Sequence, residues 1–512
     1  MSLILAASVS SVALADAALD HARTLLKTAI LVDGHNDLPW AIHERKSAPM
    51  DLDAVDLTKP GPGDTDIPKL RAGGVGAQLF SVYVPGDLKD GRFARMQLEQ
   101  IDLARRLIAK YPDDLALCTS AEDIVRAHAA GKIGSLLEME GGHAIENSLG
   151  ALRAYYDLGV RSMALVHNQT LAWADAAQDE PKHHGLTDFG REVVREMNRL
   201  GMIVDLAHAS PETMRDALAT TTSPVIFSHA CAKALADHPR NVPDDVLTKL
   251  AANDGVVMIA FVPIFASGKI ASWWAPVWPE VLLDPRISTL DRVKAEHEKV
   301  AGPEPKATLA DVADQIEYVR KVAGVDHVGL GADFPPTAGA PEGLEDVSKY
   351  PALLAELIRR GWKDEDVVKV AGGNFLRVLR ANEANAKKGG ASLASLPADP
   401  PPFAGVWRGV STCVKDDVHP ACKDETVVYR IAAKDAVHAS MDAFKIVDGK
   451  ELLMGSIDFA YDAAKDAWVG DFQNETVHIR WSYRVRGDEM LGTLVDLPSN
   501  HLSRQAFAKR DR

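Results

Sequence analysis

The residues best suited to chemistry are histidines and carboxylates near the ends of short apolar runs. The first run continues as Val32-Asp-Gly-His35-Asn-Asp37. On an extended chain, residues two apart point to the same face, so His35 and Asp37 can reach one ion. A single His-x-Asp pair is weak evidence, because it also arises by chance.

Later runs add further groups of the same kind. The third run ends Leu137-Glu-Met-Glu140, followed by two glycines, and Glu138 and Glu140 share a face. Carboxylates are rarely buried unless they are paired or bind a metal. Three other runs end at His167, His208 and His229. So many imidazoles and carboxylates predict a zinc pair, which one carboxylate could bridge. Glu138 lies one layer deeper and is interpreted as a supporting or structural residue.

Two more residues are suited to handling a substrate. Asp333 ends the last run and could pass a proton from water to a leaving group, or it could cap the next turn. Arg240 precedes a predicted helix that starts at Asp244-Asp245. Its planar guanidinium suits a substrate carboxylate, although a salt bridge that caps the helix is the alternative.

The elements that must position these groups are eight apolar runs separated by amphipathic stretches. Alternation of strands and helices predicts βαβ units and a parallel sheet, and eight units predict a (β/α)8 TIM-type barrel. Active sites of such barrels lie at the carboxyl ends of the strands, where the candidate groups fall. The predicted strands are Ala29–Asp33, Val75–Val84, Ile133–Glu140, Arg161–His167, Met202–His208, Pro224–His229, Gly255–Phe261 and His327–Asp333.

A proline-rich stretch at residues 393–403 predicts a linker between the barrel, residues 21–392, and a C-terminal domain, residues 404–512. Short alternating runs in the last part predict a small antiparallel β domain. An aromatic-rich insertion, Ser272–Pro279, is predicted to form a lid or a dimer contact, with simple packing as the alternative. The runs of the β domain are Thr426–Ile431, Ser456–Tyr461, Val477–Val485 and Met490–Leu497.

Composition narrows the class of protein. The 512 residues are 46% hydrophobic and 25% charged, typical of a globular protein, and the net charge of −15 argues against a nucleic-acid partner. Residues 1–20 are interpreted as the remnant of a signal peptide, with a non-polar tail as the alternative. Export would permit a disulfide between Cys413 and Cys422, which otherwise stay free thiols. We therefore expect a periplasmic or extracellular protein without a spanning helix.

The motifs together resemble the renal (membrane) dipeptidase family of the amidohydrolase superfamily. The resemblance runs from about residue 29 to residue 383. The metal motifs carry part of it, and two longer stretches are more specific. These are Arg240-Asn-Val-Pro-Asp-Asp245 and Pro341-Glu-Gly-Leu-Glu-Asp-Val-Ser-Lys-Tyr-Pro351.

The resemblance implies a role for each residue and two Zn²⁺ per chain. His35 and Asp37 would bind one zinc, and His208 and His229 the other. Glu140 would bridge the two ions. His167 would hold the substrate carbonyl or its oxyanion, Arg240 the C-terminal carboxylate of a dipeptide, and Asp333 would shuttle the proton. The family also implies a homodimer.

One departure concerns the last strand. Family members usually continue as Asp-Phe-Asp-Gly, whereas this chain has Asp333-Phe-Pro-Pro336. The proposed proton shuttle, Asp333, is kept, whereas the loop that follows it is altered. The departure therefore bears on substrate preference, including the acceptance of D-residues at the C-terminal position. One alternative hypothesis is a related amidohydrolase acting on N-acyl amino acids or lactams. Another is an inactive barrel that serves as an envelope-binding module.

Overall fold

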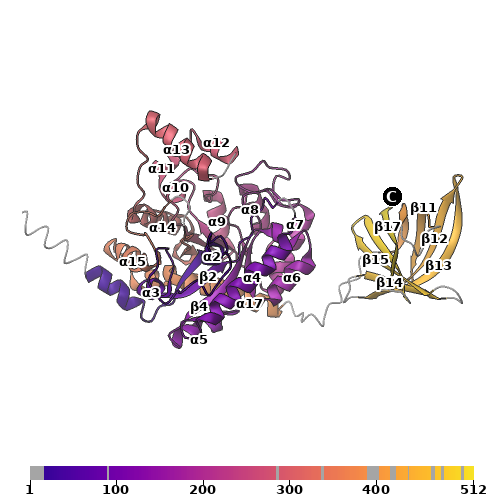
Figure 1. The fold of residues 1–512 in the computed structure, drawn as a ribbon, viewed down its shortest axis with the longest axis horizontal. Helices are drawn as coiled ribbons and strands as arrows, with labels where there is room; N and C mark the ends of the chain where they lie inside the picture. Colours follow the sequence, from indigo (N-terminus) through magenta and orange to yellow (C-terminus); the bar gives the residue numbers. More distant parts are fainter. Residues whose placement is uncertain are drawn as a thin grey trace, which may run out of the picture. The chain divides into compact units, whose positions relative to one another are not determined.

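The computed structural model describes residues 17–88, 91–283, 287–335, 339–388, 403–414, 422–435, 437–462, 467–473, 478–497 and 501–511. The chain divides near residue 390 into two compact units, each with its own hydrophobic core. Each unit is a barrel, of parallel strands in the first and antiparallel strands in the second (Figure 1).

The first unit is the predicted (β/α)8 barrel. Its strands are hydrogen-bonded in the order β2-β1-β9-β8-β7-β6-β5-β4, and pairing of β2 with β4 closes the ring. All these pairings are parallel. Each predicted run overlaps one strand of the ring, so the predicted barrel is confirmed, although the observed ends differ from the predicted ones by up to three residues. The strands are β1 (Leu31–Asn36), β2 (Val75–Ser81), β4 (Ile133–Glu140), β5 (Val160–Ala164), β6 (Ile203–Asp205), β7 (Ile226–Ala230), β8 (Val256–Ile259) and β9 (Val328–Leu330), and β3 (Leu115–Leu117) pairs beside the start of β4.

Helices surround this barrel (Figure 1). In α7 (Asp188–Leu200), Val193, Val194 and Met197 are buried on one face, as expected of a helix that covers a sheet. The Thr187 side chain accepts from Gly190 N and caps its start, and Gly201 ends it at φ 80°. The other long helices are α4 (Phe93–Lys110), α5 (Ala121–Ala129), α6 (Leu149–Asp157), α8 (Pro211–Thr220), α9 (Asp244–Ala252), α13 (Ile287–Ala301), α14 (Leu309–Ala323), α15 (Tyr350–Arg359) and α17 (Asn374–Lys388).

The aromatic insertion after β8 forms short helices with buried side chains. Trp273 and Trp274 are buried, and Trp274 Nε1 donates to Glu304 Oε1 at 2.7 Å. Trp278 contacts the ring of His238, two residues before Arg240. These contacts favour the packing interpretation of this segment. The remaining short helices of the unit are α2 (Leu38–His43), α3 (Ile67–Ala72), α10 (Pro263–Ala266), α11 (Gly268–Trp274), α12 (Trp278–Leu283) and α16 (Asp364–Val368).

The second unit is a closed antiparallel barrel in which each strand pairs with its neighbours in sequence and β10 pairs with β17. The predicted β domain is therefore confirmed, with more strands than the four runs named from the sequence. The strands are β10 (Gly405–Cys413), β11 (Glu425–Ala433), β12 (His438–Val447), β13 (Lys450–Asp462), β14 (Ala467–Gln473), β15 (His478–Arg486), β16 (Glu489–Asp496) and β17 (His501–Arg510).

Cys413 and Cys422 form a disulfide across a Cα–Cα distance of 5.9 Å, whereas Cys118 and Cys231 are free and buried. Most of the predicted linker, and residues 1–16 of the predicted signal remnant, lie outside the described residues. Residues 17–25 form a helix in which Ala18 and Ala22 are buried. Among the described residues, no helix is both long and apolar enough to cross a membrane.

Candidate active site

Glu140, the last residue of β4, lies at the centre of the polar cluster. Its Oε1 lies 3.0 Å from Nε2 of His208 and 3.6 Å from Nε2 of both His167 and His229. Its Oε2 lies 3.7 Å from Nε2 of His35. Four histidines from four different strand ends therefore present the same ring nitrogen to one carboxylate.

The opposite ring nitrogen of three of these histidines is held by a neighbouring polar group. Nδ1 of His208 lies 3.0 Å from Asn168 Oδ1, and Nδ1 of His229 lies 2.9 Å from Ser228 Oγ. Nδ1 of His35 lies 2.9 Å from Glu138 Oε2. When Nδ1 donates to such an oxygen, Nε2 carries a lone pair, as a metal ligand must.

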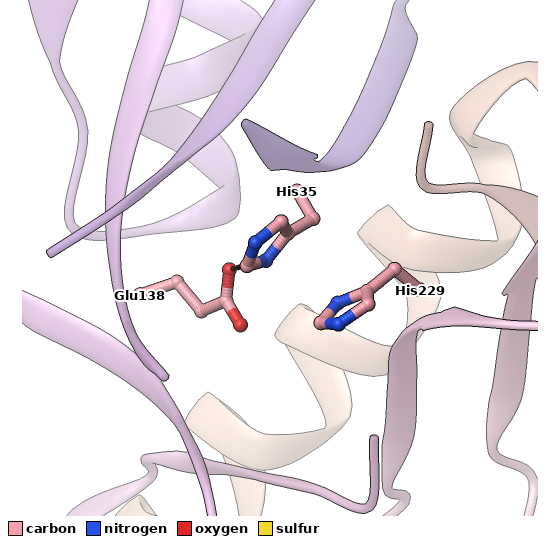
Figure 2. A group of neighbouring side chains, drawn as sticks. All are labelled: His35, Glu138 and His229. Carbon is pink, nitrogen blue, oxygen red and sulfur yellow. Dashed lines mark hydrogen bonds and ion pairs between the residues drawn. The ribbon is translucent and has the colours of Figure 1, made fainter. Parts of the chain in front are cut away.

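Figure 2 shows Glu138 beside His35, with the His229 ring next to it. The His35 and His229 ring centroids are 4.0 Å apart. Glu138 is fully buried behind His35, on the same face of β4 as Glu140. This placement agrees with its predicted supporting position, because its carboxylate fixes the His35 ring from behind.

Asp37 and Asp333 lie on the other side of His35. Asp37 Oδ2 is 3.4 Å and Asp333 Oδ1 is 3.8 Å from His35 Nε2. Asp333 N also donates to His35 O at 3.3 Å, so the end of β1 holds the residues after β9 in place. The two carboxylates are 19% and 21% exposed, which leaves this side of the cluster open to solvent or substrate.

Burial and charge shift the pKa values of the cluster in opposite directions. Burial lowers the pKa of His167, His208 and His229 well below its ordinary value, so these imidazoles are neutral. Burial opposes the charged form of His35, but the carboxylates around it, Glu138 foremost, raise its pKa well above the ordinary value.

The carboxyl groups shift upwards. Burial raises the pKa of Glu138 to about 8 and that of Asp333 to about 6. Burial, together with the neighbouring carboxylates, also raises the pKa of Glu140 well above its usual range. Ionising several buried carboxyl groups so close together is unfavourable in free energy unless positive charge lies among them.

Arg240 is 2% exposed, and its guanidinium lies 5.3 Å from the centre of the Phe265 ring. Its Nη1 is buried and has no hydrogen-bond partner among the described residues. No described carboxylate forms an ion pair with Arg240, which argues against the helix-capping alternative. Burial lowers its pKa to about 10, against the opposing charges of Asp333 and Glu140. The site thus holds a buried cation with an unused donor.

The cluster suits a metal in its chemistry and its unpaired atoms. His35 Nε2 and Asp37 Oδ1 are buried and lack a hydrogen-bond partner. Nε2 of His208 and Nε2 of His229 face each other at 3.0 Å. Two imidazole nitrogens on one tetrahedral zinc would lie roughly 3.3 Å apart. Three groups of described residues have ligand atoms close enough to hold an ion: His35-Glu138-His229, Glu140-His167-His208 and His35-Asp37-Asp333.

Local backbone geometry places several of these side chains. His208 and Asp333 adopt φ of 67° and 68°, a region that non-glycine residues seldom occupy. Gly141 follows Glu140 at φ 124°, and a Cβ there would lie 2.4 Å from the His143 ring. The glycines after Glu140 therefore permit the tight approach expected from the sequence.

The structure brings all the predicted site residues to one end of the barrel: His35, Asp37, Glu140, His167, His208, His229, Asp333 and Arg240. Sequence reasoning missed Asn168, Ser228 and Tyr83, whose ring contacts His167 at 4.9 Å between centroids. Asn168 and Ser228 are chain neighbours of predicted ligands, and Tyr83 follows β2, so position at a strand end is the signal that could have found them.

Comparison with known proteins agrees with this geometry. The model of the membrane dipeptidase family (peptidase family M19) matches residues 19–392. The chain belongs to the membrane dipeptidase family. It is therefore a metallodipeptidase, and the prediction of the family and of a metal-dependent dipeptidase is confirmed.

Solved structures show the same fold. The probable dipeptidase PvdM from Pseudomonas aeruginosa is 23% identical with a TM-score of 0.63, and the match covers 72% of this chain and 99% of that one. A metallopeptidase from Rhodobacter sphaeroides, liganded with a phosphinate mimic of L-Ala-D-Ala, is 22% identical with a TM-score of 0.58, and the match covers 69% of this chain and 99% of that one.

Proposed function

We propose that this dipeptidase uses two zinc ions and cleaves dipeptides with a free C-terminal carboxylate. The observation that carries the proposal is the convergence of four Nε2 atoms and Asp37 on Glu140. In this assignment His35 and Asp37 hold one ion, His208 and His229 hold the other, and Glu140 contacts both. Zinc at such a site lowers the pKa of water to ~7 and polarises a carbonyl.

The residues around the ligands would then act on the substrate. His167 is neutral, so its ring can donate one hydrogen bond to the carbonyl oxygen as negative charge develops there. Asp333 has a pKa of about 6, near the working pH, which suits a group that takes a proton and delivers it to the departing amine. Because Asp333 is partly exposed, it can reach both the water that gives up the proton and the amine that receives it.

Arg240 would set the length of the substrate. A carboxylate bound to its free Nη1 would satisfy a buried donor and a buried charge together. Because the guanidinium is fixed in the wall of the site, only a substrate with its carboxylate one residue beyond the cleaved bond would fit. The solved relative that holds an L-Ala-D-Ala mimic supports D-residues at the C-terminal position.

The test compares a dipeptide with its C-terminal amide. The wild-type protein should prefer the free acid in kcat/KM by about 100-fold, since a charged hydrogen-bonded pair in a buried site contributes roughly 3 kcal/mol. Arg240→Ala should lose most of the activity on the acid and abolish the preference. Arg161→Ala, which removes a half-buried guanidinium from the start of β5, is the control and should keep the preference. An Arg240→Ala enzyme that still prefers the acid would refute the role.

A second candidate is hydrolysis of N-acyl amino acids, which share the amide and the carboxylate with dipeptides. The loop after β9 favours keeping this candidate, because Pro335 and Pro336 follow Asp333-Phe334 where the family usually has Asp-Gly. A panel of L- and D-dipeptides, their N-acetylated forms and lactams distinguishes the candidates. Faster turnover of the N-acyl forms would replace the dipeptide assignment. An inactive envelope-binding barrel is disfavoured by the complete set of candidate metal ligands.

We also propose that the protein is exported and forms a homodimer. The apolar N-terminal sequence and the Cys413–Cys422 disulfide support an oxidising compartment. Thiol labelling of protein from the periplasmic or secreted fraction should find these two cysteines unreactive, and a reactive pair would argue against export. The size of the purified protein in solution tests the dimer.

A further inference from the structure

The C-terminal barrel is filled by side chains in only one part of its interior. Phe403 and Trp468 stack there with ring centroids 4.8 Å apart, and Trp407 Nε1 donates to Phe403 O. These aromatic residues are almost fully buried, and Phe459 packs against them. This part of the interior is therefore a packed core.

The rest of the interior contains a cavity of about 260 Å³, close to the lower end of ordinary small-molecule sites. Met454 and Phe472 line it and are 43% and 39% exposed, so the cavity opens to solvent. Most of its wall is apolar and aromatic. The residues that form this wall include Met441, Ile457, Phe472, Ile479, Trp481 and Tyr483.

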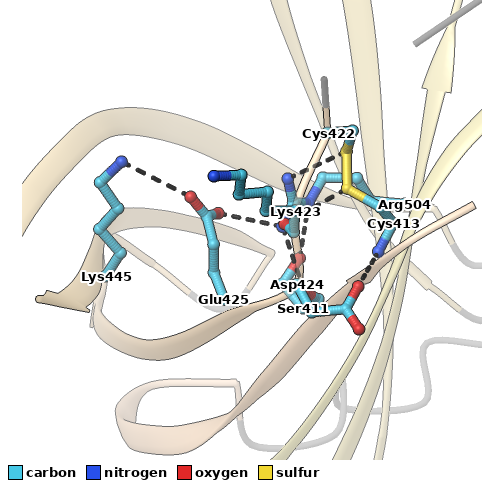
Figure 3. The surroundings of a disulfide bond; sticks show 8 residues. All are labelled: Ser411, Cys413, Cys422, Lys423, Asp424, Glu425, Lys445 and Arg504. Carbon is cyan, nitrogen blue, oxygen red and sulfur yellow. Dashed lines mark hydrogen bonds and ion pairs between the residues drawn. A yellow bond between two sulfur atoms is a disulfide. The ribbon is translucent and has the colours of Figure 1, made fainter. Parts of the chain in front are cut away.

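One side of the cavity carries charge. Arg504 and Glu425 line it and form an ion pair, with Arg504 Nη2 3.0 Å from Glu425 Oε2 (Figure 3). Lys445 does not line the cavity, but its Nζ lies 3.6 Å from the other oxygen of Glu425. Two cations therefore surround one carboxylate, and the net charge of this trio is +1.

Arg504 is held rigidly but keeps capacity to donate. Its Nε donates to Ser411 Oγ at 2.9 Å, and its Nη2 donates to Ser411 O and Lys423 O. Its Nη1 donates only to Cys422 Sγ among the described residues, at 3.5 Å. Sulfur is a weak acceptor, so an oxygen anion would be a better partner for this nitrogen.

We propose that this cavity binds a small amphipathic carboxylate, with its apolar body against the aromatic wall and its carboxylate at Arg504. Burial of the apolar body supplies the driving force, and the Arg504 Nη1 donor, which meets only a sulfur among the described residues, selects the acid. The site belongs to the C-terminal unit and shares no residue with the metal cluster. The chain would thus carry a ligand site separate from the dipeptidase site.

The first experiment uses the full-length protein and three probes with the same chain: octanoate, octan-1-ol and octylammonium. Isothermal titration calorimetry should find octanoate bound, at least tenfold more tightly than octanol and more tightly still than octylammonium. Equal affinity for acid and alcohol would overturn the role of Arg504. Tighter binding of the ammonium, or no binding of octanoate at millimolar concentration, would overturn the proposal.

The second experiment locates the binding. Ala443 lines the cavity, so Ala443→Phe should reduce octanoate affinity at least tenfold. Ala432→Phe makes the same change at an exposed position of β11 and should leave the affinity unchanged. If Ala443→Phe fails to fold, Gly455→Leu serves, because a Cβ at this lining residue meets open space. A variant that folds and still binds octanoate with wild-type affinity would place the ligand elsewhere and overturn the proposal.

Discussion

The two barrels of this chain have the same number of barrel strands but use them differently. In the parallel barrel the charged groups gather at the carboxyl ends of the strands, around Glu140. In the antiparallel barrel the interior itself carries the cavity, and its wall is mostly apolar. Parallel strands all end at one rim, so their last residues converge there, whereas antiparallel strands alternate in direction and share no such rim.

The difference also concerns electrostatics. At the rim of the parallel barrel, buried carboxylates outnumber the cations near them, which creates a need for positive metal ions. In the antiparallel barrel, Arg504 keeps a donor, Nη1, that meets only a sulfur among the described residues, which creates a preference for an anion. We therefore expect the parallel barrel to bind cations and the antiparallel barrel to bind an anion. The following variants test the two sites separately, in order of decreasing effect.

The largest effect is expected from Glu140→Gln. Loss of the central carboxylate should weaken the binding of both proposed zinc ions. Because the ions would supply several kcal/mol of transition-state stabilisation, kcat/KM should fall by about 10⁴-fold. Steady-state kinetics with a dipeptide, together with metal analysis, measures the change. Glu196→Gln, which removes a buried carboxylate from α7, is the control and should stay within about tenfold of the wild type. Retention of activity and metal by Glu140→Gln would remove Glu140 from the centre of the site.

Asp333→Asn should lower kcat by about 10³-fold, since an amide cannot carry the proton to the leaving amine. Metal content should stay at the wild-type value, because the ligands assigned to the metal are untouched. Kinetics on the metal-loaded variant checks this. If the variant instead lost metal and regained full activity with excess zinc, Asp333 would be a ligand and not a proton shuttle.

The parallel barrel and its metal-ligand candidates could largely be predicted from the sequence, because the strands are buried and the candidates lie near their carboxyl ends. The strands of the parallel barrel are covered on both faces and read as largely apolar runs, most plainly Val256–Ile259, so all eight were found from the sequence. The metal-ligand candidates end those runs and were found with them. Their roles remain predictions. Position at a strand end marks Asn168 and Ser228 as candidates, but they were missed because only the folded geometry reveals which side chain reaches a histidine nitrogen.

The antiparallel barrel was predicted less completely. Its strands β12 (His438–Val447) and β17 (His501–Arg510) mix small, charged and polar residues, so their alternation is too weak to identify from the sequence. The cavity could not be predicted at all. It depends on the sum of side-chain volumes around a closed ring, and no local pattern reports that sum.

A smaller effect is expected from Glu138→Gln. The amide keeps the shape of the side chain but replaces the carboxyl group that holds His35 Nδ1 at 2.9 Å, which should weaken zinc affinity by roughly 10–100-fold. Activity measured against free zinc concentration should therefore shift to higher zinc and reach nearly the wild-type kcat at saturation. A reduced kcat that no zinc concentration restores would show that Glu138 acts on the reaction in another way.

The smallest effect on catalysis is expected from the double variant Cys413→Ser and Cys422→Ser. Loss of a disulfide that spans nine residues should destabilise the C-terminal barrel by roughly 2–3 kcal/mol. Dipeptidase kcat/KM should not change, because the metal cluster lies in the other unit. Thermal unfolding and kinetics on the same preparation measure both. A parallel loss of dipeptidase activity would show that the two barrels are coupled.

The most direct test of a two-zinc dipeptidase is the zinc content of the full-length protein after reconstitution and removal of free metal. Elemental analysis by mass spectrometry should find two zinc ions per chain, with dipeptide hydrolysis rising in step with the zinc bound. A value of one or fewer at full activity would contradict the assignment of two metal sites around Glu140.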